Sequence, residues 1–294
     1  MAAASRRWHA GAGRSVSSAN GRRSAASRDL LQDRREVLLK VGPVKRWIAW
    51  LCLVIATCHA AAAASAETWE SRARPGVTQP VLVEIPDQPK AAAVLFAGGD
   101  GGVVFANSQL ASFRSNFLMR SRAEFLKHGF VVVTLGAPSD RSAPNYLDDK
   151  FRTSKEHAED VLAVVNSLRK RFGVPIWLVG TSRGTLSAAA AGLQLGKAID
   201  GVVLTSTMAD VVDLPINRFE VPVLMVHHER DGCRETYFRD ARRTAKKIKA
   251  PRTELVPVSG GKDEGKPCQA MAYHGFNGIE AEVVAVIAQW TLRP

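Results

Sequence analysis

Residues 176–184 read IWLVGTSRG, and this stretch decides how the rest of the chain is interpreted. Its first four residues are apolar, as in a buried strand, and the small residues that follow from 185 to 195 are typical of a helix. Between them lies the pattern G-x-S-x-G, which places Ser182 on a sharp turn between strand and helix. The pattern occurs once in the chain. It predicts a nucleophilic serine, the alternative being a tight glycine-rich turn with an idle one.

Apolar runs on both sides of this stretch alternate between strand and helix. Strands are expected at 80–86, 91–97, 130–135, 175–179, 202–205, 221–227 and 253–258, and helices at 115–128, 154–172, 185–195, 234–249 and 279–290. Strands separated by helices predict an α/β domain with a mainly parallel sheet flanked by helices. Ligands of such sheets lie at the carboxyl ends of the strands, so chemistry is expected just after each strand.

With its serine in this setting, the chain resembles the α/β-hydrolase family over about residues 80–290. The family orders its catalytic groups as nucleophile, acid and histidine. His274 follows the last strand and precedes the last helix, where the family has its histidine. The resemblance therefore assigns His274 as the base, and the alternative is a residue near the start of a helix with no catalytic role.

The resemblance also implies a catalytic acid after the strand at 221–227. Residues 223–231 read VLMVHHERD, which is similar to the family's strand followed by H-G-x-x-D, except that His228 replaces the glycine. Asp231 then matches the acid, whose task is to orient the histidine and stabilise its charged form. Asp210 and Asp213, after the preceding strand, and Glu229 stay open as alternatives.

A glycine-rich loop, FAGGDGG at residues 96–102, follows the first long buried strand. The family uses such a loop to donate a backbone N–H to the oxyanion, and the match favours Gly99, with Asp100 next. The second donor is the N–H of Arg183, at the start of a helix, where the dipole favours an anion. The Arg183 side chain is expected to form a salt bridge to a nearby loop, the alternative being to hold an anionic substrate group. The loop lacks the residues of a phosphate-binding P-loop.

The resemblance implies a serine hydrolase that cleaves carboxylic esters through an acyl-enzyme on Ser182, and the N-terminal region described below adds the expectation that it is exported. The expected fold has a minimal cap, because only short loops occupy 136–151 and 206–220. A small-molecule ester is the expected partner, and neither cofactor nor metal is expected. A peptidase or amidase of the same fold, or a non-catalytic binding protein on this scaffold, remains open. The sequence defines neither the acyl and alcohol groups nor the oligomeric state.

The N-terminal region resembles an export signal. Lys45 and Arg46 precede an apolar run from 47 to 64, and residues 64–66, ASA, form a small-x-small cleavage site. We expect a disordered or mis-started extension at 1–39, a signal peptide at 40–66 and one domain at 67–294, in the periplasm or secreted. No membrane association is then expected after cleavage, although an uncleaved membrane anchor is the alternative. Both Sec and twin-arginine export stay open, because residues 34–40 read RREVLLK.

Charge is concentrated in the same N-terminal region. The chain has a formal net charge of +12, and residues 1–66 contain 11 Lys and Arg against 3 Asp and Glu. The remaining residues contain 29 against 25 and are therefore close to balanced. Nucleic-acid binding usually requires a basic stripe with aromatic residues on the folded part, so no nucleic-acid partner is expected.

Two cysteines remain after the expected cleavage, Cys233 near Asp231 and Cys268 near His274. If the acid and base are correctly assigned, their loops meet, and the two sulfurs come within reach of each other. Export supplies an oxidising environment. A disulfide between these residues is expected, the alternative being two free thiols.

Overall fold

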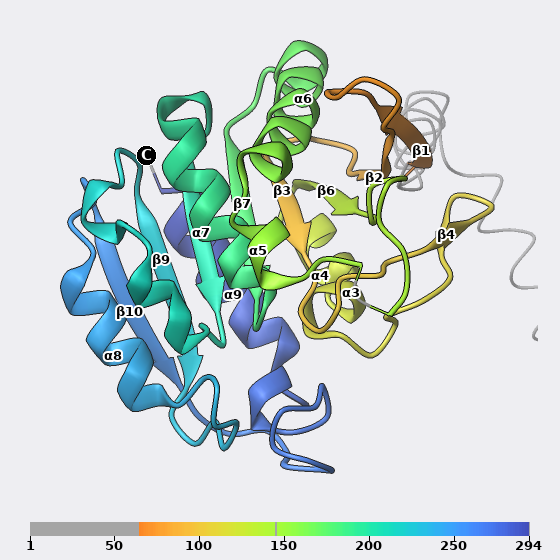
Figure 1. Ribbon diagram of the computed structural model, residues 1–294. Coiled ribbons are helices and arrows are strands. Elements are labelled where there is room, and N and C mark those ends of the chain that lie inside the picture. The colour runs from red at the N-terminus through yellow and green to blue at the C-terminus, as the bar shows by residue number, and fades with distance from the viewer. Residues whose placement is uncertain (1–64, 145, 294) are drawn as a thin grey trace, which may run out of the picture. The chain divides into compact units, whose positions relative to one another are not determined.

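The computed structural model describes residues 65–144 and 146–293. The expected extension and most of the expected signal peptide therefore lie outside the described residues. Strands and helices alternate through the described chain (Figure 1). The strands are β1 Ser65–Ser71, β2 Gln79–Ile85, β3 Ala91–Phe96, β4 Phe105–Ala106, β5 Gln109–Leu110, β6 Phe130–Leu135, β7 Ile176–Thr181, β8 Gly201–Thr205, β9 Val223–His228 and β10 Thr253–Val258. The α-helices are α3 Phe117–Arg120, α4 Arg122–Lys127, α5 Asp149–Arg152, α6 Lys155–Phe172, α7 Gly184–Leu195, α8 Phe238–Lys247 and α9 Glu280–Thr291.

The main sheet has eight strands in the order β1-β2-β6-β3-β7-β8-β9-β10. The six strands from β6 to β10 in this order pair in parallel, whereas β1 and β2 are antiparallel. The expected α/β fold with a mainly parallel sheet is therefore confirmed. All six parallel strands except β10 are buried along their whole length, which explains their apolar and β-branched sequences.

Two apolar cores lie on the two faces of this sheet. Alternate residues of β3 divide between them: Val94 and Phe96 face the core covered by α6, α7 and α8, whereas Ala93 and Leu95 face the core covered by α3, α4 and α9. The sheet is thus a middle layer between two layers of helices (Figure 1). This sandwich fixes the carboxyl ends of the parallel strands β3, β7 and β9 at the same edge of the sheet, where the candidate residues follow.

Short connections cover the carboxyl edge of the sheet. The segment between β8 and β9 contains only the 3-10 turns Ala209–Asp213 and Ile216–Arg218, and the segment between β6 and α6 contains the four-residue helix α5. Within the described residues, these segments form no helical lid, as expected. Nor does any helix there reach the length and apolarity needed to cross a membrane.

Several boundaries differ from the sequence-based expectation. The helix expected at 115–128 is two short helices, α3 and α4, which meet at Ser121. The helix expected to begin at 234 begins at Phe238, because the preceding residues form the loop after Asp231, in which the Thr236 hydroxyl donates to the Asp231 carboxylate. Strand β1, the β4–β5 hairpin and α5 were not expected at all.

Candidate active site

Ser182 stands on the turn between β7 and α7 in a strained backbone conformation. Its φ angle is 52°, in the left-handed region that residues with a side chain rarely adopt. Both flanking glycines are required by close contacts, because a Cβ on Gly180 would lie 2.4 Å from the carbonyl oxygen of Gly184, and one on Gly184 would lie 2.1 Å from that of Phe96. The G-x-S-x-G pattern is thus explained by packing, and the turn leaves the Ser182 side chain partly exposed.

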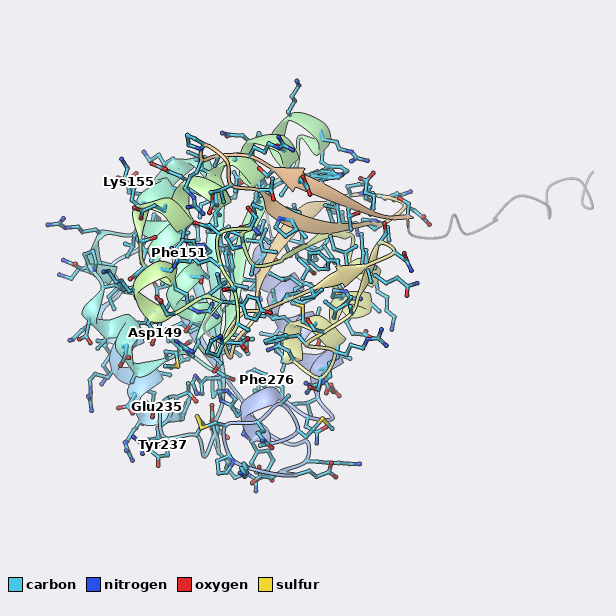
Figure 2. The ribbon with its side chains drawn as sticks, turned by 45° about the vertical axis from the view of Figure 1, so that its right-hand side comes forward. Asp149, Phe151, Lys155, Glu235, Tyr237 and Phe276 are labelled. Atoms are coloured by element: carbon cyan, nitrogen blue, oxygen red, sulfur yellow. A yellow bond between two sulfur atoms is a disulfide. The ribbon has the colours of Figure 1, made fainter. Side chains whose placement is uncertain are left out.

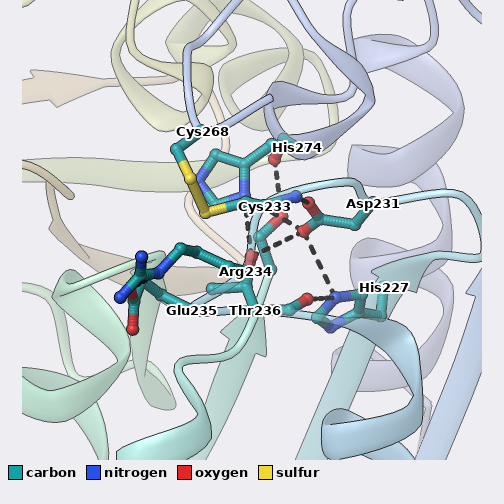
Figure 3. Close-up of a disulfide and its surroundings, with 9 residues drawn as sticks. His227, Asp231, Cys233, Arg234, Glu235, Thr236, Cys268 and His274 are labelled. Atoms are coloured by element: carbon teal, nitrogen blue, oxygen red, sulfur yellow. Dashed lines mark hydrogen bonds and ion pairs between the residues drawn. A yellow bond between two sulfur atoms is a disulfide. The ribbon is translucent and has the colours of Figure 1, made fainter. Parts of the chain in front are cut away.

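The acid and the histidine meet at the carboxyl end of β9. Asp231 Oδ2 lies 3.0 Å from His274 Nδ1, and both side chains are buried (Figure 3). The Ser206 hydroxyl donates to the backbone carbonyl of His274 at 2.6 Å, so the end of β8 also holds the histidine loop. The alternative acids Asp210, Asp213 and Glu229 are exposed, and within the described chain none of them bonds to His274.

Thr236 completes the contact between the acid and the histidine. Its hydroxyl donates to Asp231 Oδ2 at 2.9 Å, and the same Oγ1 lies 3.0 Å from His274 Nδ1, where it can accept the ring proton (Figure 3). The backbone N–H of Cys233 donates to the other carboxylate oxygen at 2.9 Å. Thr236 had no signal in the sequence, because its role depends on how the loop after Asp231 folds back.

A second histidine, His227, also contacts the acid. The backbone N–H of Thr207 donates to His227 Nδ1 at 3.3 Å, so the ring proton is on Nε2. That Nε2 lies 2.7 Å from the carbonyl oxygen of Thr236 and 3.3 Å from Asp231 Oδ2 (Figure 3). Burial raises the pKa of Asp231, but the hydrogen bonds from His227 and His274 outweigh it and hold this pKa well below its usual range. Asp231 is therefore ionised at neutral pH.

His228 takes the place of the glycine in the family's pattern, and its environment explains the departure. Its ring stacks on Tyr273, with centroids 4.3 Å apart, and its Nε2 lies 3.0 Å from the carbonyl oxygen of Gly260. The guanidinium of Arg230 also lies over the Tyr273 ring. His228 therefore packs against the residue that directly precedes His274.

Ser182 and His274 line the same small cavity, of about 60 Å³, together with Gly98, Gly99, Phe117 and Cys268 among others. No hydrogen bond joins Ser182 Oγ to His274 within residues 65–144 and 146–293. Such bonds are often long in enzymes without substrate and shorten in the reacting complex. The structure thus brings the three predicted residues to one place, with only the Asp231–His274 bond formed.

The glycine-rich loop passes beside the serine. A Cβ on Gly98 would lie 2.9 Å from Ser182 Cβ, and Gly99 is exposed with a φ of 59°. Among the hydrogen bonds of the described chain, none is donated by the backbone N–H of Gly99 or of Arg183. These two N–H groups are thus available to a ligand. The Arg183 side chain forms the expected salt bridge, 2.7 Å from Asp149 at the start of α5, which Figure 2 labels.

Cys233 and Cys268 are joined in a disulfide with an S–S distance of 2.08 Å (Figure 3). The bridge links the loop of Asp231 to the segment that leads into His274. Cys233 is buried, whereas Cys268 is exposed and lines the cavity at Ser182. Within the described residues, no group of three or more His, Cys, Asp or Glu side chains is placed to hold a metal ion.

No protein-family model matches the sequence, and no curated protein matches it significantly. Solved structures do match. An esterase from Pyrococcus furiosus is 16% identical with a TM-score of 0.56, and the match covers 77% of this chain and 91% of that one. A dienelactone hydrolase from Anabaena variabilis is 12% identical with a TM-score of 0.55, over 77% and 96% of the two chains.

The chain has the α/β-hydrolase fold. A third match with this fold is an α/β serine hydrolase without lid from Xanthomonas campestris, 14% identical with a TM-score of 0.50, over 78% of this chain and 94% of that one. At these identities the likeness concerns the fold, and the chemistry has to be argued from the site itself. In this α/β-hydrolase-fold protein, the described residues likewise place no helical lid over the edge of the sheet that bears the candidate residues.

Proposed function

We propose that this protein is an exported serine hydrolase that cleaves carboxylic esters, with Ser182, His274 and Asp231 as its catalytic residues. One observation carries the proposal: a strained, partly exposed Ser182 shares a cavity with His274, whose Nδ1 bonds to the buried carboxylate of Asp231. An idle serine would have no need of a buried acid and histidine, since burying a charge costs free energy unless it is paired.

The chemistry follows from the roles of these groups. His274 accepts the Ser182 proton while Oγ attacks the ester carbonyl, and the N–H groups of Gly99 and Arg183 stabilise the oxyanion. His274 then gives the proton to the leaving alkoxide as the C–O bond of the ester breaks, leaving an acyl-enzyme. Water attacks the acyl group with His274 again as base, which releases the acid and restores Ser182.

The proposal favours substrates whose acyl part is small. The cavity at Ser182 is small, and Phe117 and the disulfide-bonded Cys268 are among the residues that line it. Because no lid covers the described sheet edge, the alcohol part can extend into solvent. The solved structures that match in fold include esterases, which supports ester cleavage over a purely binding role.

A fluorophosphonate probe tests the nucleophile directly. We expect the wild-type protein to be labelled at Ser182, and Ser182→Ala to lose both labelling and hydrolysis while its thermal unfolding stays unchanged. Labelling of Ser182→Ala at the wild-type level would overturn the proposal. A panel of p-nitrophenyl esters of increasing chain length, run beside aminoacyl amides, separates an esterase from a peptidase or amidase.

Export is the second part of the proposal. The disulfide and the signal-like segment at 40–66 support it, because disulfides persist in oxidising compartments. N-terminal sequencing of protein recovered from the periplasm or the medium should begin at Glu67. A mature chain that keeps residues 47–64 would indicate a membrane anchor instead.

A further inference from the structure

Arg152, the last residue of α5, is a buried arginine with no acidic partner. Its exposed fraction is 0%, and within the described chain no carboxylate lies at ion-pair distance from it. Burying a cation in this way is costly, and the cost is reduced only by hydrogen bonds from the guanidinium. The acceptors it finds are all neutral: the carbonyl oxygen of Leu147 at 2.9 Å, the Ser187 hydroxyl at 3.1 Å, and the carbonyl oxygens of Gly99 at 3.1 Å and Ala97 at 3.4 Å.

Two of these acceptors belong to the glycine-rich loop beside Ser182. The guanidinium holds the carbonyl of Ala97 with Nη1 and that of Gly99 with Nη2. The peptide between Gly98 and Gly99 lies between these two held peptides, and its N–H is the proposed oxyanion donor. One rigid, planar side chain therefore restrains the donor peptide on both sides.

A second contact ties the same loop to the segment before α5. The backbone N–H of Leu147 donates to the carbonyl oxygen of Asp100 at 2.8 Å, and Leu147 in turn accepts from Arg152 Nε. Ser187 on α7 holds the guanidinium from the side of the nucleophile helix. Arg152 thus connects the loop, α5 and α7.

We infer that Arg152 is a positioning residue for the oxyanion hole: it fixes the Gly98–Gly99 peptide and places a positive charge that forms no ion pair against the loop that receives the oxyanion. This inference rests on the proposed function of Ser182. Fixed donors and charges aimed at the site where negative charge develops act on the transition state more than on the bound substrate.

The charge state of Arg152 supports this role. Burial and, to a smaller extent, the nearby charge of Arg183 lower its pKa to about 10 against the opposing effect of Asp149, Asp100 and Asp148, so the guanidinium is still protonated at neutral pH. Because the surroundings are buried, this charge is weakly screened. A developing anion above the loop is therefore favoured over the neutral ester carbonyl.

Arg74 provides a matched control. It is a largely buried arginine of the same domain, but it is paired with two carboxylates, Asp160 at 2.7 Å and Asp140 at 2.8 Å, and makes no contact with the glycine-rich loop. A change at Arg74 should affect stability alone. A change at Arg152 should affect both stability and the transition state.

The experiment compares Arg152→Lys, Arg152→Met and Arg74→Lys in the full chain, with p-nitrophenyl acetate as substrate and a trifluoromethyl ketone as inhibitor. Ser182 Oγ adds to the carbonyl carbon of the ketone, and the resulting oxyanion needs the same N–H donors, those of Gly99 and Arg183. For Arg152→Lys we expect kcat to fall about 10- to 100-fold with KM within twofold, and the inhibition constant of the ketone to rise by a similar factor. Arg152→Met, which also removes the charge, should lose more.

Arg74→Lys should lower the unfolding temperature while kcat and the inhibition constant stay within twofold of wild type. The inference is overturned if the two Arg152 variants, like Arg74→Lys, keep kcat and the inhibition constant within twofold of wild type. If Arg152→Met does not fold, the test rests on kcat and the ketone inhibition constant of Arg152→Lys and Ser187→Ala. Ser187→Ala removes one contact of the guanidinium but leaves the glycine-rich loop unchanged, so both quantities should change in the same direction as in Arg152→Lys. If the wild-type protein shows neither labelling nor hydrolysis that depends on Ser182, the proposed function itself is overturned. This result is distinct from an active wild type whose Arg152 variants are unchanged, which overturns only the inference about Arg152.

Discussion

The two ends of the candidate site differ in how their polar groups are satisfied. At the acid end, Asp231 receives hydrogen bonds from His274, Thr236 and the Cys233 N–H, and a disulfide joins its loop to the segment that leads to His274. At the nucleophile end, Ser182 has no bond to His274, and the N–H groups of Gly99 and Arg183 have no partner in the described chain. The first end is complete before a substrate binds, whereas the second keeps donors free for one.

This difference indicates where binding free energy can act. Groups at the acid end are already paired, so they preorganise the histidine at no further cost when substrate arrives. Groups at the nucleophile end are held in place by Arg152 and by the strained turn at Ser182, and under the proposed function they gain their partners only in the reaction. Substitutions at the acid end should therefore lower the rate because His274 is less well positioned. Substitutions at the nucleophile end should lower it because the oxyanion is less well stabilised.

The largest effect is expected for Asp231→Asn, which breaks the acid end. An amide in place of the carboxylate no longer fixes the His274 tautomer or stabilises its charged form, so kcat should fall about 10⁴-fold with little change in KM. Steady-state kinetics on a p-nitrophenyl ester measure this. Asp210→Asn, at an exposed acid after β8, is the control and should stay within twofold. A silent Asp231→Asn beside an inactive Asp210→Asn would reassign the acid.

The disulfide should come next. In Cys233→Ser/Cys268→Ser, the loop of 35 residues is no longer closed in the unfolded chain, so the free energy of unfolding should fall by about 4 kcal/mol. Urea unfolding of the oxidised wild type and the double variant measures this difference. Because the bridge joins the loops of Asp231 and His274, kcat should fall as well. Unchanged stability and activity would mean that hydrogen bonds alone hold this end together.

A pH effect on stability is expected at the nucleophile end, from His157 on α6. Its ring is buried between Phe96 and Phe151, and neither ring nitrogen has a partner in the described chain. Burial, together with the nearby charge of Arg152, lowers the pKa of His157 to about 3. Below pH 6.5 the unfolded chain binds a proton there that the folded chain does not, so stability should fall as the pH falls from 6.5 towards 3.

At pH 5 this residue alone should cost about 2 kcal/mol of unfolding free energy relative to pH 8. His157→Phe should remove that part of the pH dependence, whereas His128→Gln, at a half-buried histidine after α4, should keep it. Urea unfolding at the two pH values measures both. Equal slopes for wild type and His157→Phe would show that the acid sensitivity arises elsewhere.

The smallest effect is expected for Thr236→Val. The change removes one hydrogen bond to the Asp231 carboxylate and one acceptor for His274, while His227 still donates to the acid. A bond to a charged group is worth about 1.5 kcal/mol, so kcat should fall about tenfold. Thr244→Val, at a buried threonine of α8, should leave kcat unchanged and so control for packing. A fall in kcat as large as that of Asp231→Asn would mean that Thr236 is as important as Asp231 for positioning His274.

Much of this fold could be predicted from the sequence because its central strands carry strong local signals. Strand β6 has the predicted bounds, and β3 and β7 differ from theirs by one or two residues, since each is a β-branched or apolar run buried on both faces. Strand β1 gave no such signal. It is a polar edge strand, SAETWES, held mainly by its backbone pairing with β2.

The candidate site was predictable where a residue is placed by the order of elements, as for Ser182, Asp231 and His274. It was not predictable where a residue acts through a contact distant in sequence. Arg152 lies 53 positions from Gly99, and nothing around it in the sequence indicates that its side chain turns under the loop. Thr236 and Ser206 were missed for the same reason.

Strand β1 also bears on the timing of maturation. The expected cleavage site, between Ala66 and Glu67, lies inside this strand, where Ala66 pairs with Glu84 and Glu67 with Val83. A peptidase needs its substrate segment extended and free of other pairing, so the Ala66–Glu67 peptide bond would be inaccessible to it once β1 is paired with β2. If the chain is exported as proposed, cleavage has to precede the pairing of β1 with β2, so the mature N-terminus is made before this edge of the sheet forms.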